Sequence, residues 1–326
     1  MTQGIFDTTP SNFKERALET FLFQHQHNPT YRAYCDLLKI NAQVIQEVHQ
    51  IPFLPIGLFK TTKITTGNFE TETIFESSGT TGSTSSKHFV KELALYEKSF
   101  RSSFFHFYGN IDQYCILGLL PSYLERGNSS LVYMVNQFIH ESKHSSSGFF
   151  LYDHQQLAQI ILHNESIGQK TLLIGVTYAL FDFAEAFPMK LEHTIVMETG
   201  GMKGRKKEIT KTEMHEFLKA KFQLEKIHSE YGMTELLSQA YSKADGIFET
   251  PQWMKILIRE EDDPLNTNSF SENEITGAIN VIDLANRFSC SFIATEDRGK
   301  RFSNGSFELL GRIEMSDIRG CSQMAV

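Results

Sequence analysis

The sequence predicts an α/β fold, in which mainly parallel sheets are covered by helices and a smaller β-rich subdomain closes the chain. Between residue 88 and about residue 230, short apolar segments of strand length alternate with longer segments of helical periodicity, an order that is typical of parallel sheets. Beyond residue 240 the helical segments thin out, and polar loops join strand-like segments. We therefore expect an α/β core over residues 1–240 and a β-rich subdomain over residues 241–326.

The N-terminal part supplies two helices and then an extended segment. One helix is expected after Ser11, which can cap it, and another over residues 31–45. Pro52 and Pro55 exclude a helix interior in the next segment, because proline lacks the N–H donor and disfavours a helical residue before it. The period-two alternation of residues 69–75 predicts a strand.

The remaining elements follow from periodicity and capping residues. Ser85 or Ser86 can cap the first long helix, Asp153 a later one, and Thr210 with Glu213 forms a capping box. The expected helices cover residues 89–108, 129–143, 153–163, 178–187 and 210–222, and the expected strands cover residues 114–120, 148–152, 171–175, 193–197, 224–228, 253–259, 277–283 and 305–310. In such a sheet, ligands bind beyond the carboxyl ends of the parallel strands.

Composition excludes several classes of protein. The chain of 326 residues has a formal net charge of -8, so no basic surface suggests a nucleic-acid partner. No apolar run reaches the roughly 18 residues of a membrane span, and the N-terminus has neither the basic start nor the apolar stretch of a signal peptide. The 4 cysteines show no Cys-x-x-Cys spacing, which argues against a disulfide framework and a zinc site. We therefore expect a soluble, cytoplasmic protein.

The stretch from Ser77 to Lys87 contains only Ser, Thr and Gly before its final lysine. Gly79 and Gly82 allow the backbone to approach a ligand closely, and the surrounding hydroxyl and N–H groups can form a nest for an anion. The stretch lacks the Gly-Lys-Ser/Thr ending of a Walker loop and the G-x-G-x-x-G of a Rossmann turn. It predicts a polyphosphate-binding loop, and a flexible linker is the alternative on composition alone.

Two further stretches carry residues suited to a nucleotide. In the stretch from Ser229 to Glu235, Tyr231 offers a flat face for a base, Thr234 a hydroxyl for a phosphate and Glu235 an oxygen ligand for Mg²⁺. A Tyr-Gly turn that opens a helix would account for the same residues. The third stretch, an expected acidic turn at residues 294–299, is followed by Gly311 and Arg312.

The three stretches together resemble the acyl-adenylate-forming superfamily, whose motifs are S-S-G-T-T-G-x-P-K, Y-G-x-T-E and the pair T-G-D-x-G and G-R. Here Ser-Thr-Ser-Ser-Lys replaces x-Pro-Lys, and Glu296 stands where the superfamily usually has Gly. Within the superfamily, residues 120–131 and 317–322 resemble the LuxE-type acyl-protein synthetases, the long-chain-fatty-acid–protein ligases. The resemblance extends from about Ile51 to Cys321.

The resemblance implies a fold and a set of roles. The fold would be the N-terminal-domain type of the superfamily without its usual C-terminal lid, and the β-rich subdomain would complete the nucleotide site. The implied cofactors are ATP and Mg²⁺, with Glu235 as the metal ligand. The residues implied to bind the nucleotide are Ser77, Ser78, Gly79, Thr80, Thr81, Gly82, Lys87, Gly200, Gly201, Tyr231, Gly232, Met233, Thr234, Asp297 and Arg312, and those implied in catalysis are Thr234, Glu235, Arg312 and Cys321.

The implied activity is formation of an acyl-adenylate from a carboxylic acid, such as a fatty acid, followed by transfer to a thiol. Cys321 is the expected acceptor, and Cys290 or a partner protein are the next candidates. The alternative interpretation of Cys321 is a buried structural thiol. The superfamily's lid lysine would be replaced by Lys87, by a lysine of residues 203–207 or by a separate chain. An acyl pocket is implied among residues 119–124, 175–180 and 200–202.

Two other functions remain open from the sequence. A CoA ligase would release a free acyl-CoA, and a non-catalytic nucleotide-binding scaffold would bind ATP without exchanging pyrophosphate. The expected partners are the acid and an acyl-donor or acyl-acceptor protein.

Overall fold

The computed structural model describes residues 4–77, 84–121, 127–200, 210–261, 263, 265–267 and 274–313. Its helices are α1 (Phe13–His27), α2 (Pro29–Leu37), α3 (Leu58–Thr61), α4 (Leu93–Tyr108), α5 (Ser130–Ser142), α6 (His154–Ile167), α7 (Thr177–Ala186) and α8 (Lys211–Phe222). Its strands are β1 (Leu54–Pro55), β2 (Thr73–Glu76), β3 (Lys87–Val90), β4 (Cys115–Leu119), β5 (Gly148–Phe149), β6 (Thr171–Gly175), β7 (Thr194–Glu198), β8 (His228–Tyr231), β9 (Ala240–Ser242), β10 (Ile247–Glu249), β11 (Met254–Arg259), β12 (Ile275–Asp283), β13 (Phe292–Arg301) and β14 (Phe307–Arg312).

One large sheet runs through the described residues in the order β11-β12-β13-β14-β10-β9-β8-β7-β6-β4-β5, and β1 pairs with β13. Strands β4 to β8 are parallel to their neighbours at one end of this order, whereas the strands from β9 to β14 pair antiparallel. The predicted combination of a parallel α/β part and a β-rich C-terminal part is confirmed. The sheet is continuous across residue 240, and the division of the chain into domains at this point stays a prediction.

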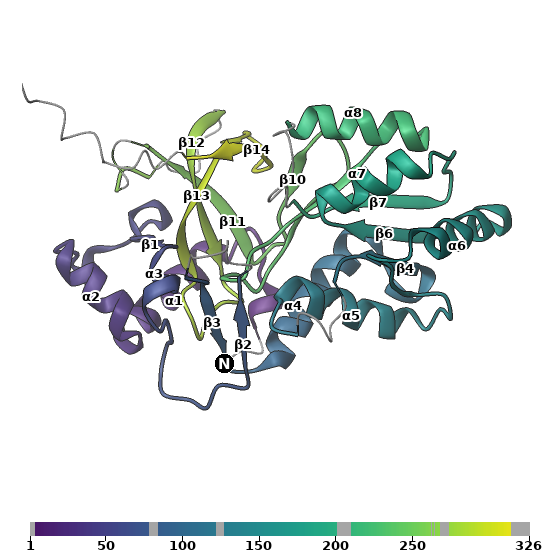
Figure 1. The fold of residues 1–326 in the computed structure, drawn as a ribbon. Coiled ribbons are helices and arrows are strands. Elements are labelled where there is room, and N and C mark those ends of the chain that lie inside the picture. The colour runs from purple at the N-terminus through teal and green to yellow at the C-terminus, as the bar shows by residue number, and fades with distance from the viewer. Residues whose placement is uncertain are drawn as a thin grey trace, which may run out of the picture.

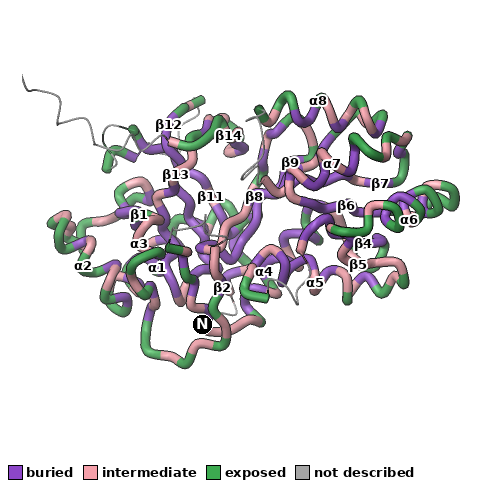
Figure 2. Tube along the Cα trace, viewed as in Figure 1, coloured by how far each residue is buried: buried purple, intermediate pink, exposed green. Residues whose placement is uncertain are grey.

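Helices cover both faces of the parallel half because its strands are apolar on both sides. In β6, Leu172 and Ile174 pack with α4 and α5, whereas Leu173 between them packs with α6, α7 and α8. This alternation follows from the period of two in a strand. Figure 1 shows α7 and α8 above the strands and α4 and α5 below them, and in Figure 2 the strands are buried while the outer helices carry the exposed residues.

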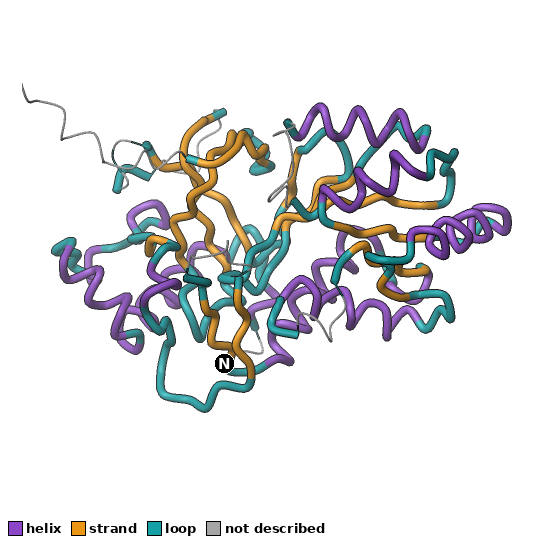
Figure 3. Tube along the Cα trace, in the orientation of Figure 1, coloured by secondary structure: helices purple, strands orange, loops and turns teal. Residues whose placement is uncertain are grey.

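The N-terminal helices pack against the antiparallel half. The rings of Phe21 in α1 and Tyr31 in α2 contact Phe292 at the start of β13. The buried Gln24 amide donates to the backbone oxygens of Asn286 and Arg287. In Figure 3, α1 and α2 therefore lie on one side of the antiparallel strands and the helices of the parallel half on the other.

Several predicted helix starts are confirmed. The side chain of Ser129 accepts a hydrogen bond from Val132 N at the start of α5, and the side chain of Asp153 accepts one from Gln156 N at the start of α6. At α8 the capping box of Thr210 and Glu213 is present. These polar caps satisfy N–H groups that have no partner within the helix.

The predicted cap at Ser85 or Ser86 is wrong, because a strand precedes the helix. Residues 87–90 pair antiparallel with residues 73–76 and form the hairpin β2–β3. The alternate burial of His88 and Val90 fits this pairing. Helix α4 begins only at Leu93, whose N–H donates to Glu72 Oε2 at 2.7 Å.

Two further boundaries differ from the sequence prediction. The helix expected over residues 31–45 ends at Leu37, because Lys39 adopts a positive φ of 56° and turns the chain. The strand expected over residues 224–228 lies instead at His228–Tyr231, so that Tyr231 is part of the sheet. The described part of the chain contains no helix that is long and apolar enough to cross a membrane.

Asp283, at the end of β12, ties the antiparallel half to the segment after Glu235. Its carboxylate is fully buried and accepts hydrogen bonds from Leu237 N at 2.8 Å and from Ser238 N and Oγ at 3.0 and 2.6 Å. Ala285 N donates to the same carboxylate at 3.1 Å. Hydrogen bonds to a charged acceptor are stronger than those between neutral groups, so Asp283 fixes the position of Leu237 and Ser238.

We predict that Asp283→Ala lowers the free energy of unfolding by about 3 to 5 kcal/mol, because several buried donors lose their acceptor at once. Urea unfolding followed by circular dichroism measures this change. The matched control, Asp112→Ala at an exposed position, should stay within about 0.5 kcal/mol of the unchanged protein. Equal effects of the two substitutions would contradict the assigned role of Asp283.

Candidate active site

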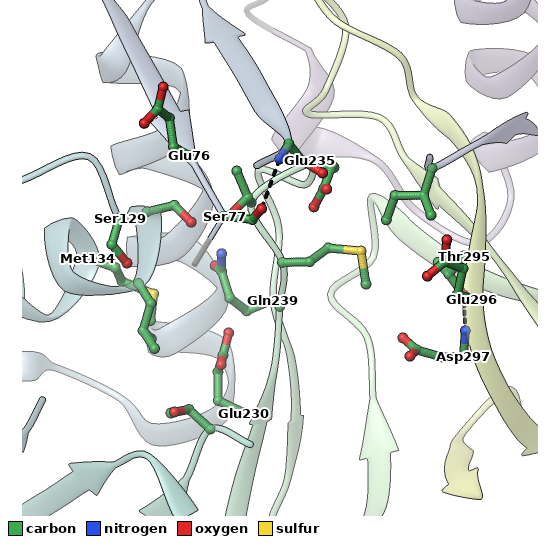
Figure 4. Close-up of a pocket in the computed structure, with 18 of the residues that line it drawn as sticks. Glu76, Ser77, Ser129, Met134, Glu230, Glu235, Gln239, Thr295, Glu296 and Asp297 are labelled. Carbon is green, nitrogen blue, oxygen red and sulfur yellow. Dashed lines mark hydrogen bonds between the residues drawn. The ribbon is translucent and has the colours of Figure 1, made fainter. Parts of the chain in front are cut away.

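A cavity of about 530 Å³ opens where the parallel and antiparallel halves of the sheet meet. Several separate parts of the chain line it, among them the β2–β3 hairpin with its loop, the segment after β8 and strand β13 (Figure 4). The described lining residues are Ile56, Lys60, Glu76, Ser77, Thr84, Ser86, Tyr96, Ser129, Ser130, Leu131, Met134, Thr199, Glu230, Gly232, Met233, Thr234, Glu235, Gln239, Thr295, Glu296, Asp297 and Arg312. The cavity lies beyond the carboxyl end of β8, as expected for an α/β sheet.

Two residues outside the segment Gly232–Glu235 hold it in place through its backbone oxygens. The Nδ1 atom of His88 is 2.7 Å from the backbone oxygen of Thr234, and Asn286 Nδ2 donates to the backbone oxygen of Glu235 at 2.7 Å. Burial lowers the pKa of His88 to about 4, so its ring is neutral near pH 7. The Thr234 and Glu235 side chains remain directed to the cavity that they line.

Glu235 presents a nearly buried carboxyl group to the cavity. Burial raises its pKa above the ordinary value, while a hydrogen bond with Ser86 and the charge of Lys60 oppose this rise. The charge of Glu296 raises the pKa further. A bound cation would stabilise a carboxylate in this position and offset the cost of its burial.

Tyr231 and Asp297 connect β8 to β13. The phenol of Tyr231 donates to Asp297 Oδ2 at 2.9 Å. The Tyr231 ring packs edge-on against Phe248 and Phe307, and it is not among the residues that line the cavity. Asp297 lines the cavity, so its position depends on a hydrogen bond from the neighbouring strand.

The acidic turn predicted at residues 294–299 is wrong, because these residues belong to β13. Asp297 lies opposite Arg312 of β14, and the register shifts between Arg298 and Gly299. Thr295 Oγ1 accepts from Asp297 N at 3.2 Å, which fixes the backbone next to this irregularity. Burial raises the pKa of Asp297, and the hydrogen bond from Tyr231 and the charge of Arg312 oppose this. The Arg312 Nε atom is 3.7 Å from Asp297 Oδ1.

The predicted phosphate loop is only partly described. Ser78 to Gly82 lie outside the described residues, as do Gly201 and Cys321. Ser77 Oγ accepts from Ser86 N at 2.9 Å, and both serines line the cavity. Lys87 does not line the cavity, and its Nζ atom lies 3.5 Å from Glu76 Oε1.

Gly200 lies in a turn that a buried carboxylate holds at the end of β7. Its N–H donates to Glu198 Oε2 at 2.8 Å, and its φ of 74° favours glycine. Burial would raise the pKa of Glu198, but hydrogen bonds from His215 and Lys211 hold it well below its usual range. Of the turn itself, Thr199 lines the cavity.

The described residues of the implied acyl pocket contribute little to this cavity. Leu119, Leu120 and residues 175–180 are not among its lining residues. Tyr96 of α4 borders the cavity instead, together with Ser129, Ser130, Leu131 and Met134 at the start of α5. The location of the acyl chain stays a prediction.

Sequence reasoning missed Lys60, Glu230 and Gln239. Lys60 and Arg312 are the basic residues among the described lining, and Lys60 forms no ion pair with a described residue. Lys60 follows β1, which pairs with β13 beside Thr295, so a contact between distant segments brings it to the site. Glu230 precedes Tyr231 and could have been found from its place in the motif. The described residues contain no cluster of three or more His, Cys, Asp or Glu residues suited to a metal.

The family model of the acyl-protein synthetase LuxE matches residues 6–325. The chain belongs to this LuxE acyl-protein synthetase family. A curated relative from Photorhabdus luminescens, named long-chain-fatty-acid–luciferin-component ligase, is 39% identical over 70 residues, which are 21% of this chain and 60% of the relative. The match thus spans about three fifths of that relative's length.

Solved structures share the fold of this LuxE family member. ATP-bound MatB from Rhodopseudomonas palustris is similar with a TM-score of 0.54 and 16% identity, over 76% of this chain and 49% of that one. An ATP-bound chimera, RpMatB-BxBclM B3, gives a TM-score of 0.56 with the same identity and coverage. The predicted fold is confirmed by this likeness, and the chain spans about half the length of these structures.

We predict that Tyr231→Phe raises the pKa of Asp297 further, because the phenol hydrogen bond stabilises the charged carboxylate. Carbon-detected NMR titration of the aspartate carboxyl groups measures the shift. Tyr114→Phe is the matched control, since it removes a phenol bond of 2.9 Å to Tyr108 O instead. An Asp297 pKa that is the same in both variants would contradict the coupling of these strands.

Proposed function

We propose that this protein uses ATP to convert a carboxylic acid into an acyl-adenylate and then passes the acyl group to a thiol. The observation that supports this proposal is the convergence of the three motif regions on one cavity. Ser77, the segment Gly232–Glu235 and the pair Asp297 and Arg312 are separated by long stretches of chain and still face the same space. A linker, an isolated turn and a structural strand would have no reason to meet there.

In this proposal Asp297 binds the ribose hydroxyls, and Arg312 binds ribose or phosphate. Thr234 donates its hydroxyl to the α-phosphate, and the Ser77 region faces the other phosphates. Lys60 adds a positive charge that the cavity otherwise lacks near Glu235. ATP carries several negative charges, so cations along its phosphates contribute directly to binding and to the transition state.

The surroundings of Glu235 fit a magnesium ion. Mg²⁺ in nucleotide sites is bound through one or two carboxylates together with substrate phosphates, so no larger cluster of protein ligands is required. Glu235 lines the cavity, is nearly buried and has a raised pKa. When bound, the ion supplies positive charge at the phosphate oxygens, and Glu235 would hold it.

The proposed reaction needs no covalent residue in its first step. A carboxylate oxygen of the acid attacks the α-phosphorus, the bond from this phosphorus to the bridging oxygen of the β-phosphate breaks, and pyrophosphate leaves. A thiolate then attacks the acyl carbon, and AMP leaves with the oxygen that had joined them. The protein contributes position and charge, which are the main sources of rate in phosphoryl transfer.

The thiol that accepts the acyl group is proposed to be Cys321. Among the described cysteines, Cys35, Cys115 and Cys290 are all buried. Burial raises the pKa of Cys35 and of Cys290 to about 12, so neither supplies a thiolate near pH 7. Cys290 is therefore a poor second candidate, and its Sγ–H donates to Phe292 O. A partner protein is the further acceptor or acyl donor that we propose.

The acid is proposed to be a fatty acid, because the curated relative is named for long-chain fatty acids. We place the activity in the cytoplasm, where ATP is available. The test is ATP–pyrophosphate exchange measured across a panel of carboxylic acids, with and without CoA. Pyrophosphate exchange that depends on an acid supports the proposal, whereas ATP binding without exchange overturns it. Release of free acyl-CoA would show that the protein is a CoA ligase instead.

We predict that Lys60→Met lowers the rate of acid-dependent pyrophosphate exchange about 10- to 100-fold, because the cavity loses a cation that faces the phosphates. Lys60→Arg should restore part of this loss. The neighbouring Lys63, which lies over the Phe89 ring and outside the cavity lining, provides the control Lys63→Met. An unchanged exchange rate in the folded Lys60→Met variant would remove Lys60 from the site.

We predict that Cys321→Ser still exchanges pyrophosphate with ATP and acid but carries no hydroxylamine-labile acyl group. Adenylation precedes the thiol step, so only the second step should be lost. Labelled acid and gel autoradiography measure the protein-bound acyl group, with Cys290→Ser as the matched control. Full labelling of the Cys321→Ser variant would identify another acceptor.

A further inference from the structure

One end of the cavity is lined by polar side chains that lack partners among the described residues. In Figure 4, Glu230, Gln239 and Met134 lie on one side, and Thr295, Glu296 and Asp297 lie on the other. The Glu230 and Gln239 side chains come from β8 and from the segment after Glu235, and both line the cavity. This end is therefore distinct from the end that we assign to the ribose.

Glu230 is a buried acid at this end of the cavity. Its residue is 8% exposed, and within the described part of the chain its carboxyl group forms no hydrogen bond or ion pair. The side chain folds against Gly232, where a Cβ atom would lie only 2.4 Å from Glu230 Oε1. Because Gly232 has no side chain, it leaves room for the carboxyl group of Glu230.

The Glu230 carboxyl group is mostly protonated near pH 7. Burial raises its pKa to about 8, the negative charge of Glu198 on β7 raises it as well, and Lys211 on α8 opposes this. Tyr96 on α4 and Tyr241 on β9 also face it. A protonated carboxyl group donates one hydrogen bond through its O–H.

Gln239 supplies the complementary acceptor. The residue is 4% exposed, and its Oε1 atom is buried without a hydrogen-bond partner among the described residues. Its Cγ atom would lie 3.4 Å from the same Cβ atom at position 232, so the Gln239 side chain passes close to the Glu230 carboxyl group. Nearby Tyr96 donates its own hydrogen to Ser130 O at 3.0 Å and is not available to Gln239.

We propose that Glu230 and Gln239 form a subsite for a hydroxyl group on the chain of the acid substrate. This inference rests on the proposed function and names its substrate class, a hydroxylated acid. A hydroxyl accepts one hydrogen bond from the Glu230 O–H and donates another to Gln239 Oε1, so that both buried groups are satisfied at once. A plain alkyl chain leaves both groups without a partner, and such sites discriminate strongly against analogues that lack the polar group.

The chemistry of the pair excludes charged groups as good occupants. An ammonium group would need an ionised carboxylate, whereas Glu230 is held mostly neutral by its raised pKa. A second carboxylate would face the negative charge of Glu198 behind Glu230 and the buried Gln239 oxygen. An uncharged group that both donates and accepts fits both partners.

The test compares octanoic acid with its hydroxyoctanoic acids, one hydroxyl at each carbon from the third to the eighth, in ATP–pyrophosphate exchange. We expect at least one isomer to exceed octanoic acid about 10-fold or more in kcat/KM. Glu230→Met and Gln239→Met should each remove most of this preference. Glu230→Gln should retain it, because the amide is also an uncharged donor, and Glu249→Met at an exposed position of β10 is the matched control.

Dependence on pH separates a hydrogen-bond donor from a merely structural residue. In the unchanged protein the preference should fall as pH rises through the Glu230 pKa of about 8, where this residue loses its proton. In the Glu230→Gln variant, the ratio of kcat/KM for the hydroxylated acid to that for octanoic acid should stay constant across the same pH range. A preference that falls equally in both proteins would overturn the role of Glu230.

The outcomes distinguish the subsite from the proposed function. Exchange with octanoic acid but no preference for any hydroxylated isomer overturns the subsite and leaves the function standing. If no acid supports exchange, the function fails, and calorimetric binding of the same acids then decides the subsite. Equal affinity for the parent and hydroxylated acids, or no binding of either, overturns it. Circular dichroism melting curves of every variant confirm that a lost preference is not a lost fold.

Discussion

The architecture depends on the change of strand direction at β8. This strand is parallel to β7 and antiparallel to β9, so the helix-covered half of the sheet ends there and the antiparallel half begins. Ser229, Glu230 and Tyr231 are all buried in it, and the chain leaves the strand directly into Gly232. Glu230 and its neighbours point to opposite faces of β8. Glu230 therefore lines the cavity, Tyr231 bonds to Asp297, and the backbone of the strand pairs with β9. A shift of one residue in this strand would exchange these roles.

The segment that follows β8 is positioned by groups that lie behind it. His88 contacts the Thr234 backbone, Asn286 contacts the Glu235 backbone, and Asp283 binds the next turn of chain. These three residues come from two separate parts of the sequence and contact mainly backbone atoms of the segment, which leaves the side chains of Thr234 and Glu235 available to a ligand. Pre-organisation of this kind means that a ligand meets groups that are already oriented, so less binding free energy is lost in ordering them. The buried, neutral state of His88, whose pKa is lowered, fits such a structural role.

Much of the fold was predictable because local signals agreed with the tertiary structure. The caps at Ser129, Asp153 and Thr210 and the buried strands β4, β6 and β7 each carry enough sequence pattern on their own. The β2–β3 hairpin was missed because its second strand is short and is defined by pairing with residues 73–76 rather than by its own periodicity. Strand β13 was missed because the Thr295–Gly299 stretch is polar, and its extended form comes from neighbours on both sides. Lys60 was missed for the same reason, since pairing of β1 with β13 places it and no local pattern marks it.

The charges of the cavity bear on the proposed binding of an anionic nucleotide. Glu76, Glu230, Glu235, Glu296 and Asp297 line it, whereas Lys60 and Arg312 are the cations among the described lining residues. Several of these carboxyl groups are already compensated: Glu76 pairs with Lys87, Glu230 holds its proton near pH 7, and Asp297 has Tyr231 and Arg312. Glu235 and Glu296 remain, and the charge of Glu296 raises the pKa of Glu235. A divalent cation carried with the phosphates would lower the cost of ionising Glu235 and reduce the repulsion of the nucleotide, so the acidity of the cavity supports the proposal that the nucleotide binds together with its metal ion.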